Sequence, residues 1–402
     1  MTDRRLLIVS PTFWPEPVGT PKYALDAGRW FAARDWAVTV VTAQPFYPDF
    51  ELYDGWGRNR RRDHIDGIRI LRMPTIVPAK GGALGRMASD LNFAAQAITR
   101  GLQRTVPQPD AILSFSPGVP MAVAAANAFG PSARHVGIVH DIQSGLAAAT
   151  GLAKGPVIDV MQAVEARCLD RADHLLALSD AMKVALVDIG VRRPIDVAPI
   201  WADIEIADRP APGSMTDTFT VTYSGNLGRK QGIPLLIDTA SVLKERDPSI
   251  RLVLRGRGAL RATAETEIAR RGLDNVHLED FVPADRLAAS LAETDLHVVP
   301  QISGSGAFAM PSKVINILAS GRPMLALCDE DDPLHRAAEE QLCLWAPPNP
   351  DDVADAIEKA RVGDVADRIV TNGLGYVRRA HDRDVILSRV EALLMGSDQP
   401  TA

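Results

Sequence analysis

Two adjacent cations stand inside a glycine-rich loop near the middle of the chain. The segment 223–232 reads YSGNLGRKQG between a predicted strand and a predicted helix, and Arg229 and Lys230 can neutralise a diphosphate there. Its spacing matches neither a P-loop nor the G-x-G-x-x-G dinucleotide fingerprint, which disfavours a dehydrogenase. We predict a diphosphate-binding loop, with a purely structural turn as the alternative. Further ligand contacts are predicted from Ser224, Gly225 and Asn226.

A second anion site is predicted where a flexible polar loop runs into a helix. Pro311 precedes Ser312 and Lys313, which open that helix. A helix N-terminus with a serine and a lysine suits a diphosphate, because its backbone N–H groups and its dipole favour negative charge. The polar loop contributes Ser303, Gly304 and Ser305, and the segment 254–258 (LRGRG), a weak signal alone, contributes Gly256.

The first half of the chain offers a glycine before a helix and a histidine at the end of a strand. Gly19 closes the loop 11–19, and its missing side chain lets backbone N–H groups approach a ligand. We predict Thr20 as the N-cap of the following helix. His140 lies at a strand end in the segment 139–141 (VHD), so we expect it to point into the same cleft as the phosphate loops. Purely structural roles are the alternative for both residues.

These loops need two sets of parallel strands to position them. Short apolar runs alternate with helical patterns, which indicates βαβ units. A segment rich in Pro, Gly and Ser, 204–217, separates the two sets. Ligands bind at the carboxyl ends of strands in open α/β sheets, so we expect the site in the loops that follow the strands. The predicted strands are 6–10, 37–42, 68–73, 110–115, 135–139 and 174–179, then 219–224, 251–255, 276–281, 296–300 and 324–327.

Composition bounds the class and the compartment. The 402 residues are 46% hydrophobic and 23% charged, the balance of a globular protein with about two domains. The three cysteines form no C-x-x-C pair, which argues against a zinc or redox site. The first apolar run, 6–9, is too short for a signal peptide, and no run of about 18 apolar residues occurs, so we expect a cytoplasmic protein.

The segment 55–105 is strongly basic, with ten basic and three acidic residues. Such a segment attracts phosphate or an anionic lipid surface. Together with a predicted helix at 86–104 it predicts contact with the inner membrane surface, and a solvated face over an ordinary core is the alternative. Nucleic-acid binding is disfavoured because the patch lacks interleaved aromatic residues and the pI is near 5.8. The apolar residues near and within that helix are Leu84, Met87, Leu91, Phe93, Ala94, Ala97 and Ile98.

Taken in order, these motifs resemble the large family of retaining, two-domain glycosyltransferases with the GT-B fold, which includes sucrose synthase. The resemblance covers nearly the whole chain. It rests on the loop ending at Gly19 and on the segments 139–141 (VHD), 199–203 (PIWAD), 224–230 (SGNLGRK), 311–313 (PSK) and 319–323 (ASGRP). Within the family, the segments 43–48 (AQPFYP) and 223–227 (YSGNL) are most similar to colanic-acid-type enzymes of exopolysaccharide assembly.

The resemblance implies two Rossmann-like, doubly wound parallel sheets that face each other across a cleft. We expect an acceptor-binding domain at 1–203, the linker at 204–217 and a donor-binding domain at 218–375. A C-terminal helix within 376–402 is expected to return to the first domain. Phe281 and Val282, at the end of the strand 276–281, join the predicted donor-binding residues.

The chain departs from the family pattern at two glutamates that are normally eight residues apart. Phe308 and Asn316 stand at those positions. Asn316 can still hydrogen-bond a ribose hydroxyl, though more weakly than a carboxylate, whereas Phe308 cannot assist at the donor sugar. Asn226 stands where an arginine is common, and we expect Arg229 to replace it.

The expected reaction is transfer of a sugar, with retention, from a nucleotide sugar to an acceptor, with UDP as the favoured nucleotide. Lys230, Arg229 and the helix start at 312–313 would stabilise the leaving diphosphate, and His140 would contact the donor sugar or orient the acceptor hydroxyl. No metal-binding motif is evident, so neither a metal nor another cofactor is expected. The expected acceptor is a glycan or a polyprenyl-diphosphate-linked sugar. A sugar-nucleotide epimerase or hydrolase on the same fold and a non-catalytic nucleotide-sugar-binding scaffold are the alternatives.

Overall fold

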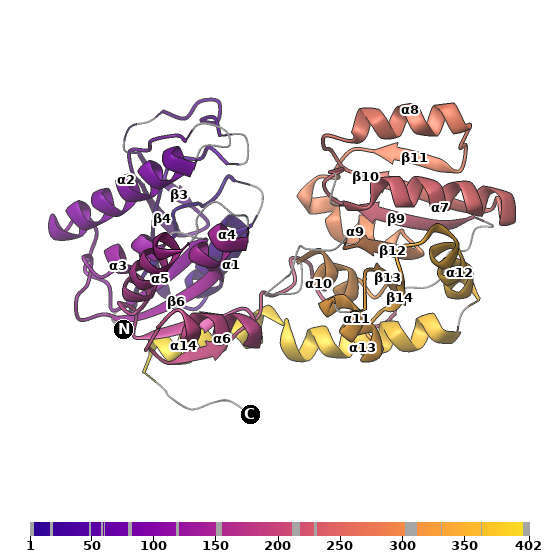
Figure 1. Ribbon diagram of the computed structural model, residues 1–402. Helices are drawn as coiled ribbons and strands as arrows, with labels where there is room; N and C mark the ends of the chain where they lie inside the picture. The colour runs from indigo at the N-terminus through magenta and orange to yellow at the C-terminus, as the bar shows by residue number, and fades with distance from the viewer. Residues whose placement is uncertain are drawn as a thin grey trace. The chain divides into compact units, whose positions relative to one another are not determined.

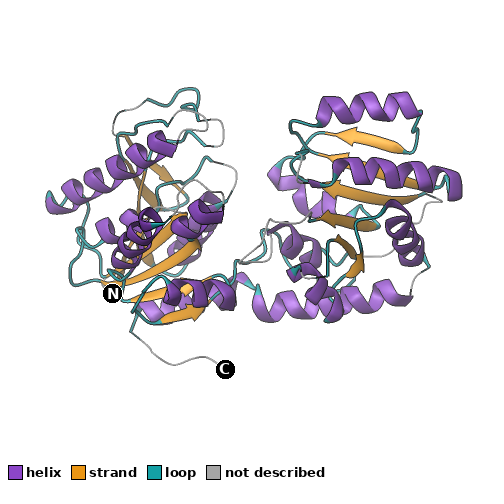
Figure 2. Ribbon diagram, viewed as in Figure 1, coloured by secondary structure: helices purple, strands orange, loops and turns teal. Residues whose placement is uncertain are grey.

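The chain folds into two compact α/β units, seen in the computed structural model in Figure 1 and, coloured by secondary structure, in Figure 2. Unit 1 comprises Met1–Ile200 and Asp384–Ala402, and unit 2 comprises Trp201–Arg383. The structure describes residues 4–16, 19–47, 50–57, 59, 61–78, 83–117, 120–149, 155–210, 218–228, 231–301, 312–330, 332–362 and 364–396.

Unit 1 is built on an eight-stranded sheet in the order β3-β4-β2-β1-β5-β6-β7-β8. Neighbouring strands are parallel except for the antiparallel pair β3 and β4. The strands are β1 (Arg4–Val9), β2 (Trp36–Thr42), β3 (Arg61–Ile65), β4 (Ile68–Arg72), β5 (Ala111–Pro117), β6 (Arg134–Asp141), β7 (His174–Ala177) and β8 (Ile195–Val197). The helices are α1 (Thr20–Ala32), α2 (Ala83–Leu102), α3 (Pro120–Ala126), α4 (Gln143–Ala149), α5 (Pro156–Leu169), α6 (Asp180–Asp188) and α14 (Arg383–Leu394).

Unit 2 carries a six-stranded, wholly parallel sheet in the order β11-β10-β9-β12-β13-β14. Its strands are β9 (Phe219–Ser224), β10 (Ile250–Arg255), β11 (Val276–Glu279), β12 (Leu296–Pro300), β13 (Met324–Leu327) and β14 (Leu344–Ala346). Its helices are α7 (Ile233–Arg246), α8 (Arg261–Arg271), α9 (Leu287–Ala292), α10 (Ser312–Ala319), α11 (Pro333–Glu339), α12 (Pro350–Arg361) and α13 (Asp364–Ala380). Between β11 and α9, residues Ala284–Arg286 form a short 3-10 helix.

The central strands are apolar on both faces, as a sheet covered by helices on both sides requires. Leu6, Leu7, Ile8 and Val9 in β1 are at most 1% exposed, and the four residues of β13 are completely buried. The apolar runs of the sequence therefore form the inner strands of each sheet. The predicted fold class, two doubly wound α/β sheets, is confirmed.

Helix α14 belongs to unit 1, although it is the last helix of the chain (Figure 1). The indole N–H of Trp30 donates to Asp384 over 2.9 Å, and that of Trp36 donates to Glu391 over 2.7 Å. Arg389 donates to the carbonyl of Val197 in β8 over 3.0 Å. These contacts attach α14 to the rest of unit 1.

Several element bounds differ from those predicted. Helix α2 begins at Ala83 and ends at Leu102, and the N-cap of α1 is Gly19, not Thr20, which is already helical and buried. The short strands β3, β8 and β14 and the short helices α4 and α11 carry too few periodic residues to be predicted. Helix α13 was not predicted, although its 17 residues are amphipathic. None of the helices in the described ranges is long and apolar enough to cross a membrane.

Candidate functional site

The glycine loops after β9 and β10 are hydrogen-bonded to each other in unit 2. The N–H of Gly225 donates to the carbonyl of Arg255 over 3.0 Å, and that of Leu227 donates to Arg257 over 2.8 Å. The N–H of Gly256 donates in turn to the carbonyl of Glu279 over 2.9 Å. The ladder of the parallel sheet thus continues past its carboxyl edge and holds both loops where a ligand of an α/β sheet binds.

Gly256 is required by the packing of these loops. A Cβ at this position would overlap the carbonyl oxygen of Gly225, and φ at Gly256 is +150°, which side chains rarely adopt. The ring of Phe281, 52% exposed, lies beside Gly256, while Val282 is only partly buried. The structure therefore brings the predicted residues Gly225, Gly256 and Phe281 together.

Tyr223, at the end of β9, fixes the shape of the first loop. Its buried hydroxyl donates to the carbonyl of Asn226 over 2.8 Å and lies 3.2 Å from Oε1 of Gln231. Sequence reasoning assigned this tyrosine no role, although it opens the YSGNL segment. Its ring also lies 5.3 Å from Nζ of Lys313, so the loop after β9 and the start of α10 meet at Tyr223.

Lys313 is a partly buried cation at the start of α10. Its removal from water lowers the pKa of its ammonium from 10.5 to about 8. No carboxylate in the described part of the chain pairs with it. Burying a cation without a counter-charge is unfavourable, and an anionic ligand would relieve that cost.

Asn316, predicted to meet a ribose hydroxyl, is held by Asp203. Its Oδ1 accepts the backbone N–H of Asp203 over 2.8 Å, and its Nδ2 donates to Oδ2 of Asp203 over 2.9 Å. Asn316 is only 7% exposed, so both ends of its amide serve a contact inside the protein. The sequence analysis singled out Asp203 within the PIWAD segment. No local pattern indicated that it pairs with Asn316.

Some of the predicted site residues fall outside the part of the chain that the structure describes, and so does Phe308. They are Arg229, Lys230, Ser303, Gly304, Ser305 and Pro311. Ser224 is the last residue of β9, Asn226 lies in the loop that follows, and Ser312 is exposed at the start of α10.

His140 lies at the carboxyl end of β6 in unit 1. Its ring centroid is 5.6 Å from that of Tyr23 in α1 and 5.9 Å from that of Phe115 in β5. Burial lowers the pKa of His140 to about 4, so the imidazole is neutral at pH 7. A neutral imidazole can give or accept one hydrogen bond but cannot supply a positive charge to a phosphate.

Gly19 precedes α1 by one residue and adopts φ of +75°. A side chain here would meet open space, so backbone conformation alone favours glycine. Tyr23, one turn further on, contacts His140 and brings the start of α1 beside the end of β6. Gly19 and His140 therefore lie near one edge of the unit 1 sheet, as predicted loops after parallel strands should.

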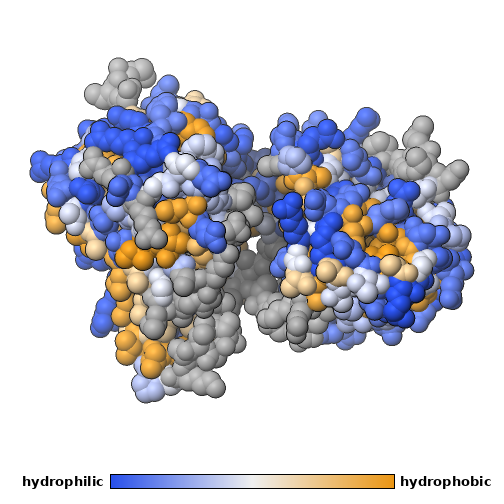
Figure 3. All heavy atoms as spheres, turned by 90° about the horizontal axis from the view of Figure 1, so that it is seen from above, coloured by the Kyte–Doolittle hydropathy of each residue, from blue (hydrophilic) through white to orange (hydrophobic). Residues whose placement is uncertain are grey.

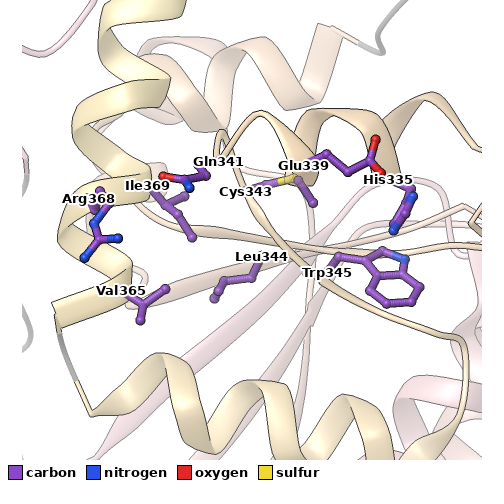
Figure 4. Close-up of a pocket in the computed structure, with 10 residues that line it drawn as sticks. His335, Glu339, Gln341, Cys343, Leu344, Trp345, Val365, Arg368 and Ile369 are labelled. Atoms are coloured by element: carbon purple, nitrogen blue, oxygen red, sulfur yellow. The ribbon is translucent and has the colours of Figure 1, made fainter.

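A separate cavity of about 400 Å³ lies in unit 2 beside the edge strand β14 (Figure 4). Helix α13 supplies Arg368 and Ile369, and the rings of His335 and Trp345 lie 4.5 Å apart in an edge-to-face arrangement. The cavity contains none of the predicted site residues. It is thus distinct from the loops after β9 and β10.

Comparison with known proteins agrees with this architecture. A model of the glycosyl transferase 4-like domain matches residues 18–201, and a model of the glycosyl transferases group 1 matches residues 205–365. WcaI of Escherichia coli (strain K12), named as a colanic acid biosynthesis glycosyl transferase, is 27% identical over 338 residues, which are 79% of this chain and 81% of WcaI.

Solved structures share the fold at low identity. Sucrose-phosphate synthase of Thermosynechococcus elongatus superposes with a TM-score of 0.70 at 16% identity, over 98% of each chain. Alr3699/HepE of Anabaena, solved with UDP and glucose, superposes with a TM-score of 0.65 at 16% identity, over 97% of this chain and 99% of its own.

Two parallel α/β units with glycine loops at the carboxyl edges of their sheets define a GT-B protein. With both family models matched in order along the chain, it belongs to the group 1 glycosyltransferases.

Proposed function

We propose that this protein transfers a sugar, with retention, from a UDP-sugar to a glycan or to a polyprenyl-diphosphate-linked sugar in cell-surface polysaccharide biosynthesis, in the cytoplasm. The observation that carries the proposal is Lys313, a cation without a described counter-charge beside the glycine loop that Tyr223 holds. WcaI, named for colanic acid biosynthesis, supports the polysaccharide role. HepE, solved with UDP and glucose, supports the choice of UDP.

In this proposal the cations replace a metal ion. As the glycosidic bond of the donor breaks, negative charge grows on the departing diphosphate, and Lys313, Lys230 and Arg229 stabilise it. The N–H groups at the start of α10 add a partial positive charge. Neutral His140 donates or accepts one hydrogen bond at the donor sugar or the acceptor hydroxyl.

A thermal-shift panel of UDP, GDP and ADP, with and without magnesium, tests the donor site. We expect an upward shift with UDP that magnesium does not change and that Lys313→Met reduces. A shift that needs magnesium would contradict the metal-free site. Full transfer activity in Lys230→Ala would contradict the role of that lysine.

Product analysis separates the alternatives. A transferase consumes the UDP-sugar only when acceptor is present and gives a product of unchanged anomeric configuration by NMR. Turnover without acceptor would favour an epimerase or hydrolase. Binding of the donor without turnover under any condition would favour a scaffold.

The outer surface of α2 supports a membrane-associated acceptor. Phe93, Ala94 and Ala97 are buried, whereas four large apolar residues one to four turns apart are exposed on one face. These are Met87 (53% exposed), Leu91 (50%), Ile98 (44%) and Leu102 (74%). Figure 3 shows hydrophobic residues gathered on the surface of unit 1, the body at the left.

Helix α5 carries a second exposed apolar stripe. Val157, Val160 and Val164 are 58%, 63% and 44% exposed. Helices α2 and α5 both pack against α3, so the two stripes belong to one helical layer of unit 1. An exposed apolar stripe on a helix is typical of an interaction site.

Vesicle flotation tests the membrane contact. We expect the protein to float with anionic vesicles, and the double substitution Leu91→Gln/Ile98→Gln to reduce flotation severalfold, whereas Val187→Gln, at an equally exposed apolar site on α6, leaves it unchanged. Absence of flotation by the unmodified protein would end the membrane proposal.

A further inference from the structure

Six aromatic side chains gather in unit 1, in the loop after β1 and in the segment between β2 and β3. All are only partly buried, and Tyr47 is 39% exposed. They come from short stretches that leave the carboxyl ends of two neighbouring parallel strands. The members of this aromatic cluster are Trp14, Phe46, Tyr47, Phe50, Tyr53 and Trp56.

The rings of the cluster contact one another. Trp14 and Trp56 lie edge to face with centroids 6.2 Å apart, and Tyr47 and Phe50 do so at 5.9 Å. The hydroxyl of Tyr53 donates to the carbonyl of Tyr47 over 2.7 Å. The ring contacts therefore form two sets, one of Trp14 with Trp56 and one in which Phe50 meets both Phe46 and Tyr47.

The buried carboxylate of Glu16 supports the aromatic cluster. Glu16, 5% exposed, accepts backbone N–H groups from Phe13 over 3.1 Å and from Phe46 and Tyr47 over 2.9 Å each. The side chain thus joins the loop after β1 to the loop after β2. Burial raises the pKa of Glu16, because little water reaches its charge.

A buried cation completes the support. Arg72, at the end of β4, is completely buried, donates to Asp63 over 2.7 Å and to the carbonyl of Ala43 over 3.1 Å, and also bonds the carbonyl of Trp14. Its guanidinium lies 4.5 Å from the centroid of Trp56. Burying the charges of Glu16 and Arg72 costs free energy of desolvation. In return, the two side chains hold the loops that carry the exposed rings.

We propose that the aromatic cluster is the acceptor subsite and that it binds a pyranose ring by stacking. Aromatic faces offer flat apolar area with polar tips at little cost in conformational entropy, which suits the C–H face of a pyranose ringed by hydroxyls. The proposal rests on the proposed transferase function and names what unit 1 recognises, a sugar ring rather than a phosphate.

The position of the cluster fits this role. Its loops start at the edge of the sheet where β6 ends with His140, and the loop after β1 leads into α1, whose Tyr23 contacts that histidine. A bound pyranose would lie on the reactive edge of unit 1. Aromatic residues also anchor proteins at membrane surfaces, but rings pinned by buried charges suit a ligand of fixed shape better than fluid lipid.

Saturation-transfer NMR with the whole protein tests the subsite. The probes are the methyl glycosides of glucose, galactose, mannose and N-acetylglucosamine at millimolar concentration. We expect transfer to the C–H protons of at least one glycoside. The substitution Tyr47→Ala weakens binding about three- to tenfold, the loss of one aromatic contact, whereas Tyr47→Phe keeps the ring and the binding.

A matched control and a second variant keep the test decisive. Val187→Ala removes an exposed apolar side chain of unit 1 elsewhere and leaves the signals unchanged. Glu16→Gln keeps the shape but weakens the support, so it reduces saturation transfer while Tyr47 remains. Thermal melting of each variant shows that it is folded.

The outcomes are separable from those of the donor site. No saturation transfer to any glycoside, or equal transfer in Tyr47→Ala, overturns the subsite. Loss of vesicle flotation in Tyr47→Ala with glycoside signals intact assigns the cluster to the membrane and overturns it as well. An upward thermal shift with UDP in the Tyr47→Ala protein shows that the donor proposal stands whatever the glycosides do.

Discussion

We expect Lys313 to make nucleotide binding depend on pH in a range where the diphosphate of the nucleotide does not titrate. The pKa of its ammonium in the free protein is lowered to about 8 by burial. A bound diphosphate places negative charge beside the amine and returns the pKa toward its ordinary value of 10.5. The second ionisation of a phosphate has a pKa of about 6, so the diphosphate is almost fully charged above pH 7.

Linkage gives the direction and the size of the effect. Above pH 8 the free lysine has lost its proton and must regain it to bind, so affinity falls as pH rises. With a pKa near 8 free and 10.5 bound, Kd for the diphosphate rises about tenfold between pH 7 and pH 9. The free protein behaves in the opposite sense: because the folded pKa is depressed, its free energy of unfolding rises with pH from about 8 to 10.5.

Isothermal titration with UDP at pH 7, 8 and 9, at constant ionic strength, measures the slope. Lys313→Arg provides the matched control, because a guanidinium stays charged above pH 12 and its variant should bind with the same Kd at all three values. Lys313→Met should bind weakly and equally at each pH. A tenfold slope that persists in Lys313→Arg would refute the assignment, and so would a flat profile in the unmodified protein.

Three further substitutions test the packing around the site. Gly256→Ala forces a Cβ against a backbone carbonyl and should lower the free energy of unfolding by about 3 kcal/mol, which is a fall in Tm of about 6–12 °C by calorimetry. The control Gly272→Ala, whose Cβ meets open space, should lower it by only about 1 kcal/mol. Asn316→Asp sets a second carboxylate against Asp203, which raises the pKa of the new carboxyl, so Tm relative to the unmodified protein should fall between pH 5 and pH 8, and an equal difference at both would contradict the pairing. Arg72→Met leaves buried acceptors without their cation and should lower the free energy of unfolding by about 3–5 kcal/mol in a urea titration; a loss below about 1 kcal/mol would show that the network contributes little.

The sequence was informative where one local pattern decides the structure. The apolar runs around Leu6 and Met324 could only be buried strands, and glycines after strands marked the loops that the structure brings together at Gly225 and Gly256. The alternation of apolar runs with helical patterns on both sides of the linker was enough to predict two doubly wound sheets. Short edge strands such as β14 have no such pattern, because three residues show no period.

Contacts between distant segments could not be read in the same way. The amide of Asn316 meets Asp203 across 113 residues, and Trp36 meets Glu391 across 355. No local spacing reports such a pair. Helix α2 shows the same limit. Its sequence has apolar residues on more than one side, and only the structure shows that Phe93 is buried whereas Leu91 is exposed.

The attachment of α14 to unit 1 has a consequence for folding during synthesis. Unit 1 is completed by Asp384 and Glu391, which follow unit 2 in the sequence and reach the indoles of Trp30 and Trp36 only after unit 2 has been synthesised. A ribosome therefore cannot release a finished first unit ahead of the second, unlike domains that fold in order as they emerge. A chain that stops at Arg383, the last residue of unit 2, lacks the hydrogen-bond partners of both Trp30 and Trp36, so the completeness of this last helix decides the completeness of unit 1.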